Sequence, residues 1–115
     1  MNILITGGTG FIGKQIAIKI LELGTISFDG QAAQTIDKVI LFDAFAGEEL
    51  PQDPKIQVIT GDITDKSLVE KITENIDVVW HLAAVVSSAA EADFDLGMNV
   101  NLYGLLTLLE ALRKH

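Results

Sequence analysis

The feature that most constrains the fold of this 115-residue chain is a glycine-rich stretch, TGGTGFIG, at residues 6–13. A short apolar run at residues 3–5 comes directly before it. Apolar residues at helical spacing follow over residues 11–23, and Gly24 stands where a helix C-cap is expected. An apolar run without polar alternation is typical of a strand buried on both faces. The sequence therefore predicts a strand, a tight turn and a helix in immediate succession.

The glycines of this turn fit two spacings. They read as G-x-x-G-x-x-G through Gly7, Gly10 and Gly13, or as G-x-G-x-x-G if Gly8 replaces Gly7. Either spacing suits a dinucleotide pyrophosphate, because a tight turn needs positive φ and the anion must approach backbone N–H groups without meeting a Cβ. The alternative is a glycine turn without a ligand. A P-loop does not fit, because Gln15 and not Ser or Thr follows Lys14.

The rest of the chain alternates buried strands with helices. Strands are expected at residues 39–42, 56–59 and 78–82, helices at 65–74 and 95–113, and a small hairpin or loop at 25–37. This alternation requires crossover connections and a parallel sheet. We predict an α/β fold, a Rossmann-type doubly wound parallel sheet with strand order 3-2-1-4, in one domain over residues 1–115.

Composition excludes several classes of function. The formal net charge of −8 opposes a nucleic-acid groove, which needs a basic stripe. The chain has no cysteine, so a disulfide framework or thiolate metal site is excluded, and we expect no metal. The sequence shows no signal peptide and no apolar run long enough for a membrane helix, so we expect a cytoplasmic protein with no membrane partner.

The residue that ends the second buried strand bears on cofactor choice. Asp43 can accept hydrogen bonds from both ribose hydroxyls of an adenosine and would repel a 2′-phosphate. No arginine lies near it in the sequence. The expected cofactor is NAD and not NADP; the competing interpretation is an aspartate that caps a turn.

Taken together, four ordered motifs resemble those of the extended short-chain dehydrogenase/reductase family, in the part that binds NAD. The motifs are residues 6–13, 61–63 (GDI), 81–84 (HLAA) and 101–104 (NLYG). The resemblance implies an NAD site formed by the glycine turn, the aspartate after strand 2, and the second and fourth motifs. Its residues would be Gly7, Gly10, Phe11, Ile12, Gly13, Asp43, Asp62, Ile63, Leu82, Ala83 and Ala84.

The resemblance also implies roles for individual residues. Asp62 would accept from the adenine amine while Ile63 packs on the ring, and Asn101 would support the active site. Residues 83–88, together with residues 91–98, are similar to the D-erythronate dehydrogenase branch, often labelled nucleoside-diphosphate-sugar epimerase-like. That branch implies oxidation of the 2-hydroxyl of a sugar acid by NAD, with Ser87 and Ser88 at the substrate pocket.

The family's Tyr-x-x-x-Lys pair is missing from this sequence. Tyr103 is the only tyrosine and position 107 is threonine, so Tyr103 is expected to pack and not to react. His81 is expected to be a hydrogen-bonded structural residue. We therefore expect an N-terminal fragment of a longer enzyme, inactive alone.

Three functions remain open for the parent protein. They are a sugar-acid dehydrogenase, a nucleotide-sugar epimerase or dehydratase, and a non-catalytic dinucleotide-binding module. Leucines surround much of the last helix, more than one buried face needs, so we also expect a homo-oligomer.

Overall fold

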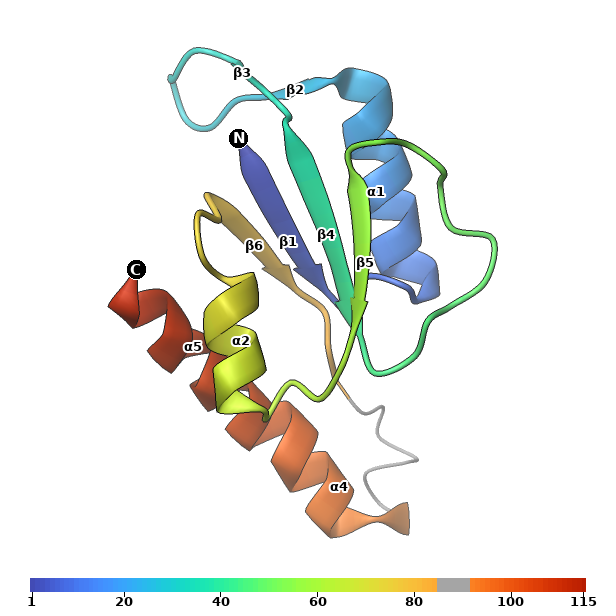
Figure 1. Ribbon diagram of the computed structural model, residues 1–115, viewed down its shortest axis with the longest axis vertical. Coiled ribbons are helices and arrows are strands. Elements are labelled where there is room, and N and C mark those ends of the chain that lie inside the picture. The colour runs from blue at the N-terminus through green and yellow to red at the C-terminus, as the bar shows by residue number, and fades with distance from the viewer. Residues whose placement is uncertain (85–91) are drawn as a thin grey trace.

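Four parallel strands form the central sheet of the computed structural model, which describes residues 1–84 and 92–115 (Figure 1). In order across the sheet they are β5 (Ile56–Thr60), β4 (Lys38–Asp43), β1 (Asn2–Thr6) and β6 (Val78–His81). The two neighbours of β1, which are β4 and β6, run parallel to it, and β5 runs parallel to β4. The predicted strand order and the parallel sheet are confirmed.

Helices cover both faces of this sheet because the strands are apolar on both sides. Ile3 and Ile5 of β1 lie in one core cluster with Ala17 and Ile20 of α1 (Phe11–Leu23). Leu4, between them, faces the opposite side and joins a second cluster formed with α2 (Lys66–Ile72) and α5 (Leu105–Lys114). Successive residues of a strand point to opposite faces, so one continuous apolar run supplies both cores.

An antiparallel hairpin joins α1 to the sheet. Gly24 ends α1 in the left-handed conformation, at φ 69°, and β2 (Thr25–Ile26) then pairs with β3 (Gln34–Thr35). The expected C-cap and the inserted hairpin are both confirmed.

The last helical stretch differs from the single helix expected over 95–113. It consists of α4 (Phe94–Met98), a π-helical segment η1 (Asn99–Gly104), and α5. A Cβ at Gly104 would lie only 2.5 Å from Cγ2 of Ile63, so the glycine lets this segment approach the sheet closely. The periodicity of apolar residues does not reveal a change from i→i−4 to i→i−5 bonding, which is why the sequence did not predict η1.

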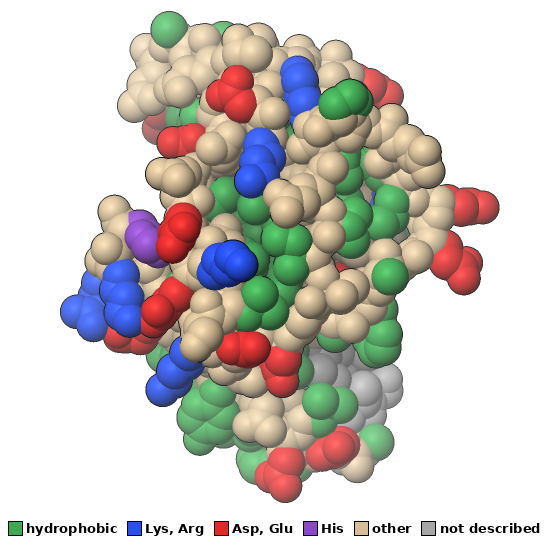
Figure 2. All heavy atoms as spheres, in the orientation of Figure 1, with side chains coloured by type: hydrophobic (Ala, Val, Ile, Leu, Met, Phe, Trp, Pro, Cys, Tyr) green, Lys and Arg blue, Asp and Glu red, His purple; other side chains and the backbone are tan. Residues whose placement is uncertain are grey.

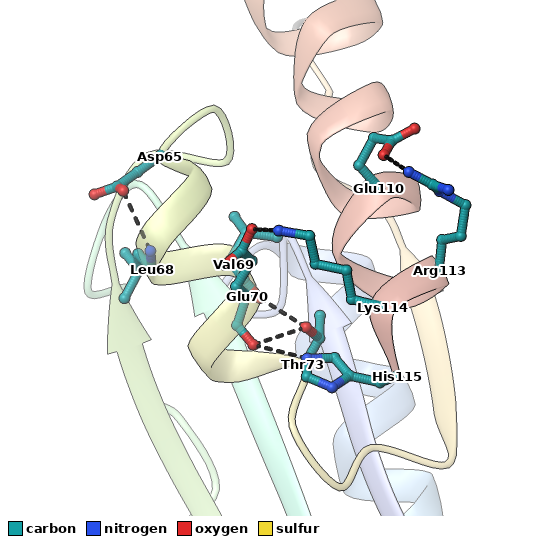
Figure 3. A network of polar contacts seen from close by, with 9 residues as sticks. All are labelled: Asp65, Leu68, Val69, Glu70, Thr73, Glu110, Arg113, Lys114 and His115. Carbon is teal, nitrogen blue, oxygen red and sulfur yellow. Dashed lines mark hydrogen bonds and ion pairs between the residues drawn. The ribbon is translucent and has the colours of Figure 1, made fainter.

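Polar contacts fix the end of α5 against α2 (Figure 3). Lys114 forms an ion pair with Glu70, and the Nε2 atom of His115 lies 3.2 Å from the carbonyl oxygen of Glu70. The hydroxyl of Thr73 donates to the carbonyls of Val69 and Glu70, at 2.9 and 3.0 Å. Because the Lys114–Glu70 ion pair is exposed, packing between the two helices contributes more to stability than this ion pair does.

Apolar side chains remain exposed along the last helical stretch. Figure 2 shows hydrophobic side chains at the lower end of the molecule, where α4 lies in Figure 1. Leu102, Leu106 and Leu109 are between 41% and 51% exposed, and Phe94 is 72% exposed. Within the described residues, no helix combines the length and apolar character needed to cross a membrane.

The order of the strands determines where a ligand can bind. From β1 the chain continues to β4 and β5 on one side, and then returns to place β6 on the other side of β1. The connections diverge at the carboxyl ends of β1 and β6. Open α/β sheets bind ligands in the crevice outside such a switch point.

Two adjacent leucines of α5 test the packing. Leu108 is 2% exposed within the core, whereas Leu109 is 51% exposed. We predict that Leu108→Ala lowers the free energy of unfolding by about 2–5 kcal/mol, because a buried leucine leaves a cavity. Leu109→Ala should cost less than about 1 kcal/mol, since an exposed surface position is usually close to neutral. Urea unfolding measures both, and equal losses would contradict the assignment of the core face.

Candidate dinucleotide site at the switch point

A cavity of about 660 Å³ opens at the carboxyl ends of the strands. It is surrounded by residues from the glycine turn, from β4 and the loop after it, from the segments after β5 and β6, and from the last helical stretch. They are Gly7, Gly10, Phe42, Asp43, Ala44, Phe45, Gly61, Asp62, Ile63, Leu82, Ala83, Ala84, Leu96 and Val100. Three of the four sequence motifs, residues 6–13, 61–63 and 81–84, thus meet with Asp43 at one end of the sheet.

Backbone crowding explains the first and last glycines of the turn. Gly7 has φ 68°, and a Cβ there would lie 2.8 Å from the carbonyl carbon of Leu82. A Cβ on Gly13 would lie 2.5 Å from the carbonyl oxygen of Gly7. The turn therefore packs against the segment after β6, and α1 packs against the turn, with no room for a side chain at either contact.

The other two glycines have different surroundings. A Cβ on Gly8 would lie 2.7 Å from the carbonyl oxygen of Ile5 and 2.8 Å from Cα of Leu41, so Gly8 packs on the strands. A Cβ on Gly10 meets only the carbonyl oxygen of Gly7, at an ordinary 3.4 Å. Because Gly8 does not line the cavity, the geometry favours the spacing Gly7, Gly10, Gly13. Within the described chain, no packing contact requires glycine at position 10.

The N-terminus of α1 points its first N–H groups toward this end of the sheet. Its N-cap, Gly10, has no side chain, and the first turn carries no acidic residue. The backbone N–H of Gly10 is bonded to the carbonyl of Gly7, at 3.2 Å. N–H groups at a helix start have no partner within the helix and, together with the helix dipole, attract anions.

Asp43, at the end of β4, ties the glycine turn to the next loop. Its Oδ2 accepts from the backbone N–H of Thr9 at 3.3 Å, and its Oδ1 from that of Phe45 at 3.4 Å. The Thr9 hydroxyl in turn donates to the carbonyl of Phe45, at 2.9 Å. Each carboxylate oxygen keeps a further lone pair, so Asp43 can still accept from a ligand at the cavity.

Asp62 and Ile63 follow β5 and line the same cavity. One oxygen of Asp62, Oδ1, accepts from the backbone N–H and hydroxyl of Thr64, at 2.8 and 2.7 Å. These hydrogen bonds lower the pKa of Asp62, so its carboxylate stays charged at neutral pH. Ile63 is only 6% exposed and packs in the core with Leu4 and Phe42, so little of its side chain remains for a ligand.

A buried hydroxyl organises the segment after β6. Oγ1 of Thr6 accepts from the backbone N–H groups of Leu82 and Ala83, at 3.1 and 3.2 Å. It also lies 2.6 Å from Nδ1 of His81. The expectation of a hydrogen-bonded, structural His81 agrees with this contact. Thr6 was not among the expected site residues, although a polar residue directly after the apolar run at residues 3–5 was a visible signal.

Some expected site residues lie away from the cavity lining. Phe11, Ile12 and Gly13 belong to the first turn of α1, where Phe11 and Ile12 have exposed side chains, so only their backbone N–H groups suit an anion. Asn101, on η1, lies beside a smaller hollow lined by residues of α4 and η1. Ser87 and Ser88 lie outside the described residues. The lining residues that were not among the expected site residues are Phe42, Ala44, Phe45, Leu96, Val100 and Gly61, the last of which belongs to the second motif.

A model of the 3-beta hydroxysteroid dehydrogenase/isomerase family matches residues 4–115, nearly the whole chain. The chain belongs to this family. Its resemblance to extended short-chain dehydrogenases/reductases is thereby confirmed. D-erythronate dehydrogenase of Cupriavidus necator is 47% identical over 99% of this chain and 35% of its own length.

Solved structures of proteins similar to this chain share its fold. A nucleoside-diphosphate-sugar epimerase from Agrobacterium tumefaciens is 33% identical with a TM-score of 0.83, over 99% of this chain and 32% of that one. UDP-glucose 4-epimerase of Thermus thermophilus, in complex with NAD, is 32% identical with a TM-score of 0.78. The match covers 99% of this chain and 34% of that one. The chain thus spans about a third of the length of the relatives it matches.

Alanine substitutions at Gly13 and Gly10 distinguish a glycine that packing requires from one that only ligand access requires. We predict that Gly13→Ala lowers the free energy of unfolding by about 1–3 kcal/mol, because the new Cβ meets rigid backbone at 2.5 Å. Gly10→Ala should unfold like the wild type, because its Cβ enters open space at an ordinary φ of −73°. Urea unfolding compares the two, and a stable Gly13→Ala would contradict the close packing of α1 on the turn.

Proposed function

We propose that this chain forms the NAD-binding part of an NAD-dependent dehydrogenase or epimerase that acts on a sugar derivative. One observation carries the proposal. The bare N-terminus of α1, the side-chain-free Gly7 and Gly10, and the carboxylate of Asp43 meet at one cavity over the switch point of the sheet. These are the groups that a diphosphate and an adenosine ribose need.

The residues present fit NAD along the whole cavity. The backbone of Gly10, with the N–H groups of Phe11 and Ile12, would hold the pyrophosphate, and Asp43 would accept from the adenosine ribose hydroxyls. This local arrangement of donors explains how a chain of net charge −8 can hold an anion, since distant surface charges are screened.

The two ends of the cofactor would use the remaining motifs. Oδ2 of Asp62 would accept from the adenine amine, and Leu82, Ala83 and Ala84 would line the opposite end with backbone and small side chains. When bound, NAD supplies a hydride acceptor. This chain's residues bind and orient it.

We propose further that the parent enzyme oxidises the 2-hydroxyl of a sugar acid such as D-erythronate, with Ser87, Ser88 and Asn101 near the substrate. The 47% identity to a D-erythronate dehydrogenase supports this choice. The second candidate is a nucleotide-sugar epimerase, which the likeness to UDP-glucose 4-epimerase favours. The general acid/base would come from outside these residues, because the single tyrosine, Tyr103, lies on η1 and not on the cavity.

A homo-oligomer also remains a prediction. The exposed Leu102, Leu106 and Leu109 supply an apolar stripe at helical spacing that a second copy of the chain could cover.

A large side chain at Gly10 tests the pyrophosphate site. We predict that Gly10→Leu abolishes measurable NAD binding by calorimetric titration, while circular dichroism and the urea midpoint stay those of the wild type. Gln15→Leu, on an exposed position of the same helix, is the matched control and should bind NAD normally. Retained affinity in Gly10→Leu would refute the proposed site.

Replacing the carboxylate at the end of β4 tests cofactor choice. We predict that the wild-type chain binds NAD more tightly than NADP, and that Asp43→Ala weakens NAD binding at least about tenfold, because each charged hydrogen bond to a ribose hydroxyl is worth roughly 1.5–3 kcal/mol. Glu48→Ala removes the same charge from the neighbouring loop and should leave the NAD-to-NADP ratio unchanged. Equal affinity of the wild type for both cofactors would overturn the assignment.

A further inference from the structure

Thr6 and His81 end two neighbouring strands, next to residues that line the cavity. Their Cα atoms are paired in the parallel register of β1 and β6, and both side chains lie on the sheet face that α2 and α5 cover. Thr6 is fully buried, and its Oγ1 lies 2.6 Å from Nδ1 of His81. Neither residue lines the cavity itself.

Counting protons assigns the direction of each hydrogen bond. The hydroxyl oxygen of Thr6 accepts from the N–H of Ala83, and it shares the N–H of Leu82 with the carbonyl oxygen of Thr6, at 3.1 and 3.0 Å. With these two N–H groups directed at its lone pairs, the hydroxyl proton can point at Nδ1 of His81, 2.6 Å away. In that arrangement Nδ1 is the acceptor, and the ring is neutral with its proton on Nε2.

This pair is coupled to the cavity wall through one peptide. The Leu82–Ala83 peptide that Thr6 holds is the group that a Cβ on Gly7 would meet, at 2.8–3.0 Å. Gly7, Leu82 and Ala83 all line the cavity. A shift of this peptide would therefore move the wall after β6 relative to the glycine turn.

We propose that Thr6 and His81 are positioning residues that hold the Leu82–Ala83 wall at the spacing a bound dinucleotide requires, and that His81 must be neutral to do so. The proposal rests on the NAD-binding function proposed above. Protonating Nδ1 would set its N–H against the hydroxyl proton of Thr6, which would have to turn away and give up a hydrogen bond.

The surroundings of His81 give the direction of the pH effect. Burial lowers the pKa of His81 from its usual value of about 6.5. On β1 no charged side chain lies between Asn2 and Thr6. Asp77 lies at the far end of β6, where it accepts from the N–H of Asn2.

Four charged groups of the covering helices pair with one another. Glu110 of α5 pairs with Arg113, and Lys114 pairs with Glu70 of α2. Lys66 and Lys71 are the other charged residues of α2, and η1 carries only the titratable Tyr103. Because the folded pKa of His81 lies below the unfolded one, stability is complete above about pH 6.5, falls below it, and levels off beneath the folded pKa.

The first experiment needs no cofactor. Nitrogen-15 NMR of the His81 ring should show the Nε2–H tautomer at pH 7.5, and the amide of Ala83 should be protected from hydrogen exchange. Thr6→Val, which keeps the shape of the side chain, should lose that protection, and Thr6→Ser should keep it. An Nδ1–H ring, or an equally protected Ala83 in Thr6→Val, would overturn the hydrogen-bonded pair.

The second experiment measures NAD affinity between pH 5 and 8. His81→Leu should bind NAD roughly tenfold more weakly than the wild type at pH 7.5, since it loses a buried hydrogen bond. His81→Asn, whose Oδ1 can take the place of Nδ1, should restore affinity. Wild-type affinity should fall as the pH drops through the pKa of His81, and that of His81→Asn should not.

The outcomes separate this inference from the proposed function. If His81→Leu and Thr6→Val keep native circular dichroism and bind NAD as tightly as the wild type, the positioning role is overturned. The proposed NAD binding would then stand unaffected. An absence of wild-type binding would overturn the proposed function and the positioning role with it, while the NMR result would still decide whether the pair exists.

Discussion

The contact on which the rest of the structure depends is backbone against backbone at the glycine turn. Gly13 brings the first turn of α1 onto Gly7, and Gly7 brings the turn onto the Leu82–Ala83 peptide. Neither contact leaves space for a Cβ. Because α1 starts so close to the sheet, its free N–H groups lie at the carboxyl ends of β1 and β6, where the order of the strands leaves a crevice.

The same crowding distinguishes the glycines that packing requires from Gly10, whose lack of a side chain is explained by access to the cavity. Gly7, Gly8 and Gly13 are each required by a neighbour within the chain, whereas a Cβ on Gly10 would make only one ordinary contact, with the carbonyl oxygen of Gly7 at 3.4 Å. An uncapped helix start is costly unless water or a ligand satisfies its N–H groups. The proposed pyrophosphate would account for both the missing cap and the missing side chain.

The sequence predicted the sheet well because each strand is apolar on both faces and each crossover has a clear break. Asp43, Asp62 and residues 82–84 do meet at one cavity, as their positions after successive strands implied. The π-helical segment was not predictable, because apolar periodicity does not distinguish it from an α-helix and the close contact of Gly104 with Ile63 exists only in the folded chain. The hydrogen bonds of Thr6 were also missed, since they join residues 75 to 77 positions apart.

The most direct test of the central claim is a titration of the isotope-labelled chain with NAD, followed by amide NMR. If a diphosphate sits against the helix start, the amides of Gly10, Phe11 and Ile12 shift most and saturate together with one dissociation constant. Amides of the β2–β3 hairpin, remote from the cavity, stay in place. Shifts confined to other regions, with the amides of the turn unchanged at saturation, would contradict the account.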